Sequence, residues 1–307
     1  MVPSLQSLCL ESRATLELAP RRANPISLPA LRRLQIVDHW LLHFCENVRL
    51  SWNRVQVDIS RGPFITTTRR PNPSNNAPIF NCIASYLGTS FGDPETRYYL
   101  NVHVKQLYKG KAEVIMTRGR HDHGTRMETG GFTLPVYCGK LPEQTIAKHM
   151  ESFFNAVPLP GTSTLDVDAA LPPSLWQQLS CTHIDQLESL TLSNHAVRSF
   201  ILACNNYTAA PLFPELKELQ LKTGKFAIAT RKDSKPYHVL RNLEAALSAR
   251  KRKGLALQSL KIVYEGKLTD EELAFVRAAR LAERLRITEL GYAKKAQYAP
   301  AEDIPDT

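Results

Sequence analysis

The chain has 307 residues, of which 43% are hydrophobic and 22% are charged, with a formal net charge of +10; this composition excludes wholesale disorder and suits a folded chain with a large core. No apolar run approaches the roughly 18 residues of a membrane-spanning helix, and the amino terminus lacks a basic start and an apolar stretch, so we expect neither a membrane span nor a secretory signal. Six cysteines lie one at a time without paired motifs, which indicates a reducing compartment, the cytoplasm or the nucleus.

The pattern L-x-x-L-x-L, in which Ile sometimes replaces the last Leu, recurs along the chain and opens each predicted repeat. It begins at Leu5, Leu31, Leu187, Leu216 and Leu257. Two of the steps match the period of roughly 20–29 residues in leucine-rich repeats, whereas the last step needs a longer return segment. The final two apolar residues of each copy stand two apart and project from one face of a strand. We therefore predict that the second leucine of each copy lies on neighbouring strands of one common sheet: Leu8, Leu34, Leu190, Leu219 and Leu260.

Residues 1–60 are predicted to form amino-terminal repeats, and residues 61–140 an irregular repeat or insertion. After the loop-like "RGPFITTTRRPNPSNNAP", apolar and polar residues alternate along "YYLNVHV", the chain turns at "YKGK", and a second alternation follows, which predicts a β-hairpin. A separate small β subdomain is the alternative interpretation of this region. Tyr99 and His103 are predicted to point away from the apolar face of the hairpin and to bind a partner.

Two histidines of the insertion, His121 and His123, flank an aspartate in a glycine-rich segment. On an extended segment their side chains would share one face and reach one metal ion. A metal site needs three or four ligands, and no further Cys or His lies at ligand spacing, so a loop of solvated polar residues explains the pattern equally well. They are weak candidate metal ligands, and the sequence predicts no cofactor.

Residues 141–290 are predicted to form carboxyl-terminal repeats in which each strand precedes an amphipathic helix. Helices are expected over residues 141–157, 195–205 and 234–253, with Gly254 as a stop signal, and again after a capping box that starts at Thr269. "LPPSLWQQL" predicts a short helix with Trp176 facing inward, and residues 291–307 are expected to be a flexible tail. The predicted fold is therefore an α/β, irregular leucine-rich-repeat solenoid with parallel strands on one face, helices on the other and a β-hairpin-bearing insertion.

These units resemble the leucine-rich-repeat portion of fungal F-box-like proteins. The resemblance rests on "LPALRRLQI", "LESLTLSNHAVRSFILAC", "PLFPELKELQLK" and "LEAALSARKRKGLALQSLKIVYEGKLTDEEL", and the middle of the chain matches more loosely. It implies a solenoid that recognises protein substrates, joined to an F-box that docks on the adaptor of a ubiquitin ligase. Because the sequence begins inside a repeat, we expect a substrate receptor without its own F-box, which would engage the adaptor only if an F-box were encoded upstream.

Positive charge is concentrated in residues 211–262, which hold twelve Lys or Arg against four Asp or Glu. The run Arg250, Lys251, Arg252 and Lys253 supplies candidate partner-binding residues. It has three interpretations: a nuclear-localisation or nucleic-acid patch, a phosphate-contacting edge, or the solvated last turn of a helix whose dipole favours cations. A basic nucleic-acid-associated module using residues 217–261 is accordingly the alternative function.

The motif search favours recognition over catalysis. The sequence contains no phosphate-binding loop, no nucleophile elbow of the G-x-S-x-G type and no H-E-x-x-H pair, so no enzymatic activity is predicted. The predicted function is the binding of an unknown protein substrate through the strand face and the inserted loops, with no membrane as partner.

Overall fold

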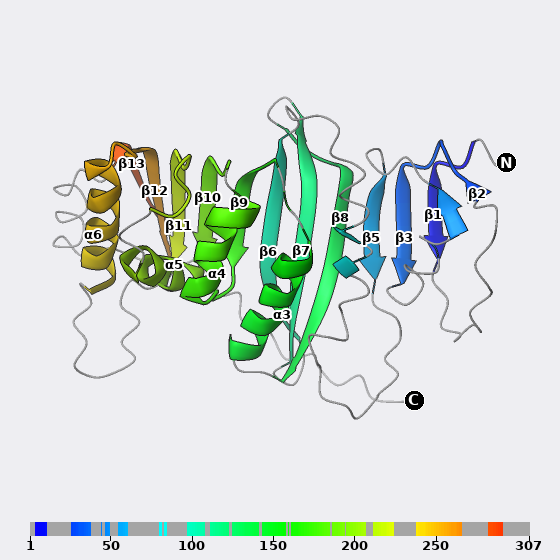
Figure 1. Ribbon diagram of the computed structural model, residues 1–307, viewed down its shortest axis with the longest axis horizontal. Helices are drawn as coiled ribbons and strands as arrows, with labels where there is room; N and C mark the ends of the chain where they lie inside the picture. Colours follow the sequence, from blue (N-terminus) through cyan, green and yellow to red (C-terminus); the bar gives the residue numbers. More distant parts are fainter. Residues whose placement is uncertain are drawn as a thin grey trace, which may run out of the picture.

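The computed structural model describes residues 4–10, 26–37, 44, 47–49, 55–60, 80–81, 83–84, 97–107, 111–122, 125–140, 143–157, 159, 161–184, 186–193, 195–206, 211–223, 238–265 and 282–290. These residues form a mixed α/β structure with one large, open and mostly parallel sheet of 11 strands, on which a few helices pack (Figure 1). A second, two-stranded parallel sheet pairs β2 (Ile26–Ser27) with β4 (Val48–Arg49) near the amino terminus.

The large sheet extends along the long axis of the molecule, from the amino-terminal strands at one end to the carboxyl-terminal strands at the other (Figure 1). Across the sheet the strands lie in the order β1 (Ser7–Leu10), β3 (Arg33–Val37), β5 (Gln56–Ser60), β8 (Thr125–Lys140), β7 (Lys111–Asp122), β6 (Tyr98–Leu107), β9 (Thr162–Asp168), β10 (Ser189–Ser193), β11 (Glu218–Thr223), β12 (Leu257–Glu265) and β13 (Ala282–Leu290). The helices are α3 (Glu143–Ala156), α4 (Pro173–Gln178), α5 (His195–Asn206) and α6 (His238–Arg252), and a π-helical turn over Leu179–His183 continues α4.

The middle of the sheet confirms the predicted hairpin and reverses the chain order. β6 pairs with β7 in antiparallel fashion, and β7 pairs in the same way with β8. β8 then lies parallel to β5, and β6 lies parallel to β9, so these three strands belong to the large sheet on both sides. The strands of the insertion therefore bridge the amino-terminal and carboxyl-terminal strands instead of forming a sheet of their own.

Two rows of largely buried side chains cross the sheet on the side where the described helices pack. The first row is Leu8, Leu34, Val57, Phe132, Arg118, Leu100, Leu165, Leu190, Leu219, Leu260 and Leu285. The second row includes Ile36 and Ile59 on one side and Leu134, Met116, Val102, Val167, Leu192, Leu221, Ile262 and Ile287 on the other. All five predicted leucines share one sheet, which confirms that part of the prediction. They do not all lie on neighbouring strands, because β5, β8, β7, β6 and β9 separate Leu34 from Leu190, so that part of the prediction is wrong.

One charged residue interrupts these rows. Arg118 on β7 is only 1% exposed, and its guanidinium carbon lies 4.0 Å from the centroid of the Tyr98 ring on β6. A guanidinium over an aromatic face gains a cation–π attraction that is strongest away from water. Arg118 therefore occupies a position in the first row where its neighbours along the row are apolar.

The helices form where apolar residues recur at helical spacing, and they pack on the central and carboxyl-terminal parts of the two rows. On α3, Phe153 packs against Phe132 of β8 and against Phe80, with ring centroids 6.2 Å and 5.4 Å apart. On α4, Trp176 is fully buried against Phe200 of α5, as predicted, and its indole Nε1 donates a hydrogen bond of 3.1 Å to Ser199. Helix α6 ends just before Gly254, whose φ of +77° is the left-handed conformation that a glycine adopts readily.

The last strand of the sheet was not predicted, and two predictions lie outside the described residues. The strand β13 was not predicted as a strand, although Leu285 and Ile287 alternate with arginines along it. The helix expected after Thr269 and the tail expected over residues 291–307 lie outside the described residues. Within the described part of the chain, no helix combines the length and the apolar character needed to cross a membrane.

Candidate partner-binding surface

The face of the sheet opposite the helices carries polar side chains, and we call it the uncovered face. The helices α3 to α6 lie on the same side of the strands in Figure 1, and their apolar residues share one core with the two buried rows. Along β10 every second side chain is only half-buried and points to the other side. From β6 to β13 the described residues of the uncovered face are the buried Tyr99 together with Asn101, His103, Thr164, Asp166, Asp168, Ser189, Thr191, Ser193, Glu218, Gln220, Lys222, Ser259, Lys261, Val263, Arg284, Arg286 and Thr288.

Charge on the uncovered face changes sign from β9 to β13. β9 presents Asp166 and Asp168, β10 presents only hydroxyl side chains, and β11 to β13 present mainly cations. Lys222 on β11 reaches back across β10, and its Nζ lies 3.7 Å from Oδ2 of Asp166. On the opposite flank, Nδ1 of His103 lies 3.5 Å from Oδ2 of Asp168. The surface therefore offers a partner an acidic strand and a basic end, separated by a strand of hydroxyl groups.

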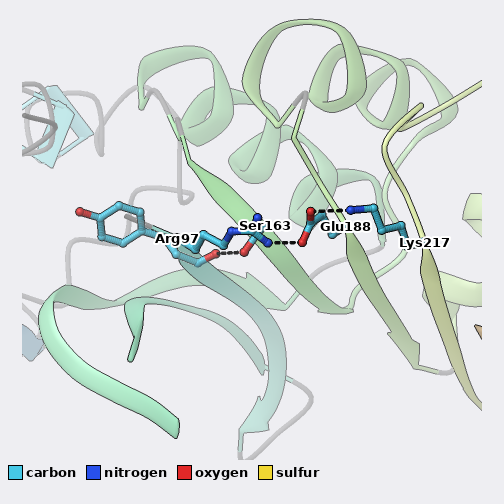
Figure 2. A network of polar contacts seen from close by, with 5 residues as sticks. Arg97, Ser163, Glu188 and Lys217 are labelled. Carbon is cyan, nitrogen blue, oxygen red and sulfur yellow. Dashed lines mark hydrogen bonds and ion pairs between the residues drawn. The ribbon is translucent and has the colours of Figure 1, made fainter. Parts of the chain in front are cut away.

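A second polar cluster lies where the parallel strands begin. The side chain of Glu188, just before β10, accepts hydrogen bonds from Arg97, just before β6, and from Lys217, just before β11 (Figure 2). The Lys217 Nζ lies 2.8 Å from Oε1 of Glu188. Backbone bonds follow the same path, because the Glu188 amide donates to the Ser163 carbonyl and the Lys217 amide donates to the Glu188 carbonyl, each at 2.9 Å. This cluster ties the insertion to the carboxyl-terminal strands.

The two cations around Glu188 make its ionised form more stable. The hydrogen bond from Lys217 is the main cause that holds the pKa of Glu188 below its usual value of 4.5, the charge of Arg97 acts in the same direction, and partial burial opposes both. A carboxyl group whose pKa is depressed on folding stabilises the folded state above the pKa of the unfolded chain, and this contribution is lost as the pH falls through the folded pKa.

We expect Glu188→Gln to destabilise the fold at pH 7 and to make little difference at a pH well below 4.5. The effect should be modest, up to about 1 kcal/mol, because the cluster is accessible to solvent. Urea unfolding at both pH values measures it, and Glu218→Gln, an exposed carboxyl at the start of β11, is the matched control. An equal loss of stability at both pH values would show that the charge of Glu188 does not stabilise this cluster.

The structure separates the two residues of the hairpin that were predicted to bind a partner. His103 is exposed, with 62% of its side chain accessible, and belongs to the uncovered face. Tyr99 is only 3% exposed, so the prediction that it lies on the surface is wrong. The reason is its cross-strand neighbour, Gly119: a Cβ added there would lie 2.5 Å from the Tyr99 hydroxyl oxygen, so the ring occupies the space that the glycine leaves.

The basic run at the end of α6 also divides. Lys251, Arg252 and Lys253 are exposed, as expected for the last turn of a helix. Arg250 is only 5% exposed, so for this residue the solvated interpretation is wrong. Its guanidinium donates hydrogen bonds to three backbone carbonyls of the segment before β11: those of Leu212, Phe213 at 3.1 Å and Leu216 at 3.3 Å.

Arg250 supports an unusual backbone conformation. Phe213 has a φ of 49°, in the left-handed region that side chains other than glycine rarely adopt. Its amide donates a 2.6 Å hydrogen bond to the Ser180 hydroxyl, and its ring stacks on Phe200 with centroids 6.4 Å apart. Burial lowers the pKa of Arg250 and is also the main cause that raises the pKa of the neighbouring Cys204 thiol to about 12. Both residues therefore belong to the packing between α5, α6 and the loop before β11.

The metal hypothesis falls outside what the structure describes. His121 lies on β7 but its side chain is not among the described ones, and His123 is outside the described residues altogether. Elsewhere in the described chain, no three His, Cys, Asp or Glu side chains come together as metal ligands would.

Sequence reasoning missed most of the uncovered face. Asp166, Lys222, Arg284 and Arg286 were not singled out, although each follows or precedes a buried or partly buried leucine, valine or isoleucine in an alternating strand. That alternation was the available signal, because every polar residue between two buried ones must point to the opposite face. What the pattern does not give is which strands are neighbours, and so which charges meet.

Comparison with known proteins finds no family model, no curated sequence and no solved structure that matches this chain.

Proposed function

We propose that this protein is an irregular leucine-rich-repeat solenoid that recognises a protein partner through the uncovered face of its sheet. The observation that carries the proposal is the asymmetry of the sheet: the helices pack on one side, and the other side carries a mixed-charge surface from β6 to β13. Three consecutive parallel registers place leucine beside leucine from β9 to β12, which supports a repeated strand-and-helix unit in this half of the chain.

The resemblance to fungal F-box-like proteins extends the proposal to a substrate receptor of a ubiquitin ligase in the cytoplasm or the nucleus. In this proposal the partner is a protein substrate, and contact with the ligase adaptor requires an F-box encoded upstream. The segment "LPPSLW" superficially resembles the start of an F-box, but it does not offer a docking helix, because Leu171, Leu175 and Trp176 are buried in the core. No enzymatic activity is proposed.

Site-specific photo-crosslinking tests the proposal. A benzophenone amino acid replaces Gln220 on the uncovered face or, as the matched control, Gln177, which is exposed on α4 on the helical side. In a cell lysate we expect discrete protein adducts from position 220 and not from position 177, and mass spectrometry identifies them. Adducts of equal number and identity from both positions, or none from position 220, would contradict recognition through this face.

The described cations of residues 217–261 do not support nucleic acid as the partner. Lys217 pairs with Glu188, Arg250 is buried, and the exposed end of α6 lies on the helical side, away from Lys222 and Lys261 on the uncovered face. These cations therefore do not gather into the single basic surface that phosphate binding favours.

A further inference from the structure

We infer that the basic end of the uncovered face, defined by Lys261, Arg284 and Arg286, docks an acidic segment of the partner protein in extended conformation. This inference rests on the proposed function, because it names the chemistry of the partner that the same face receives. It begins from the register of the last two strands.

The three cations are concentrated by the pairing of β12 with β13. Lys261 is the direct neighbour of Arg286 in the parallel register, and Ser259 is the neighbour of Arg284. Both arginines are exposed, Lys261 is half-exposed, and the described residues provide none of the three with an acidic partner. Like charges directly opposite each other on neighbouring strands are destabilising, so an anion bound between them would relieve a repulsion already present in the free protein.

The spacing of the cations fits carboxylates on an extended chain. Neighbouring strands lie roughly 4.8 Å apart, and residues two apart on a strand are separated by about 6.6 Å. Side chains two apart in an extended peptide repeat at the same distance, so an acidic residue at every second position would match Arg284 and Arg286 in turn. The planar guanidinium group binds a carboxylate through two parallel hydrogen bonds, which favours this pairing over a simple charge contact.

The rest of the face favours a protein segment over a nucleic acid. Asp166 and Asp168 lie on β9 of the same face, and Glu218 lies on β11 next to Ser259; all three would repel a continuous phosphate backbone. The described residues of the uncovered face from β9 to β13 include no aromatic side chain on which bases could stack. A protein segment can place acids over β12 and β13 and polar or basic residues over β9.

The competing structural explanation is protection of a sheet edge. β13 is the last strand of the described sheet, and charged residues on edge strands prevent association with other strands. That role depends on charge of either sign, whereas docking of an acidic segment depends on positive charge. Reversal of the charge therefore separates the two explanations.

The experiment measures binding of a fluorescein-labelled dodecapeptide of alternating Glu and Ser by fluorescence anisotropy, with a Gln–Ser peptide of equal length as the control ligand. We expect the Glu peptide to bind and the Gln peptide not to bind. The double variant Lys261→Glu, Arg286→Glu should weaken binding at least about tenfold. The matched variant Lys251→Glu, Arg252→Glu makes the same charge change on the exposed end of α6 and should leave the affinity nearly unchanged.

Three outcomes would overturn the inference: no binding of the Glu peptide by the wild type, equal weakening in both variants, or a short DNA duplex that binds more tightly than the peptide and displaces it at physiological salt. Circular dichroism confirms that each variant is folded. Photo-adducts from position 220 would leave the proposed function standing in any of these cases, whereas their absence would remove the proposed function even if the peptide bound.

Discussion

Leu190→Ala should lower the free energy of unfolding by about 2–5 kcal/mol, a large part of a typical total of about 5–15 kcal/mol. Leu190 is fully buried on β10, with Leu165 and Leu219 as its neighbours in the first row. Truncation removes apolar contacts on three sides, and the helix α5, which packs over β9, β10 and β11, cannot settle into the cavity without leaving its other contacts. Urea denaturation measures the change.

The adjacent Thr191→Ala is the matched control, because Thr191 lies on the same strand but on the uncovered face. We expect it to change the free energy of unfolding by less than about 0.5 kcal/mol. Similar losses from the two substitutions would mean that the inward and outward faces of β10 are wrongly assigned.

Arg250→Ala should destabilise the protein by about 2–4 kcal/mol, although Arg250 belongs to a run of four basic residues that reads as solvated surface. The substitution removes the guanidinium donor from the buried carbonyls of Leu212 and Leu216, whereas the Phe213 carbonyl keeps its hydrogen bond from the Leu216 amide. An unsatisfied buried polar group costs about 1–3 kcal/mol. It also removes support from the left-handed Phe213, while the relief of burying one charge less offsets part of the loss.

Arg252→Ala, two residues along the same helix turn, is the control and should cost less than about 0.5 kcal/mol. Arg250→Lys should recover little of the stability, because a single ammonium group does not reproduce the planar fork that reaches the separate carbonyls. Thermal unfolding compares the stability of the three variants. Equal transition temperatures for Arg250→Ala and Arg252→Ala would contradict a stabilising role of the Arg250 hydrogen bonds.

The alternation of apolar residues was enough to predict most of the strands and helices of the carboxyl-terminal half. Period two around Leu190 and period 3.6 around Phe200 are local signals, and both elements are present in the structure. Local patterns do not carry the neighbours of a strand, however. The reversed order β8, β7, β6 depends on long-range packing beneath α3, and so do the parallel pairings of β8 with β5 and of β6 with β9. A short window of sequence does not contain this information.

The same limit explains the errors at individual residues. In the alternation along β6, Tyr99 points away from the helices, as predicted. It is nevertheless buried, because the hairpin register places it opposite Gly119, which leaves space for its ring. Arg250 could have been placed from the sequence, because it continues the stripe of Leu243 and Leu247 at spacings of seven and three residues. The run of four basic residues suggested a solvated surface, whereas helical periodicity assigns Arg250 to the buried face of α6.

Arg118 shows the opposite case. The alternation through Val114 and Met116 predicts that Arg118 points toward the core, whereas its charge favours exposure to solvent. The structure follows parity, because the Tyr98 ring and the first row surround the side chain. Parity along a strand is fixed by backbone geometry, so it prevails over the preference of one side chain when the neighbours supply a compatible environment.

Cysteine accessibility is the direct test of whether one face of the sheet is buried in the core along its length and the other, the uncovered face, is accessible to solvent. Single cysteines replace Leu34, Gln35, Leu219 or Gln220, and iodoacetamide labelling under native conditions is followed by peptide mass spectrometry, which reads each introduced thiol separately from the native ones. We expect fast labelling at positions 35 and 220 and slow labelling at positions 34 and 219, where the thiol becomes accessible only when the structure opens locally. Equal rates within either pair, or the reverse order, would contradict this arrangement.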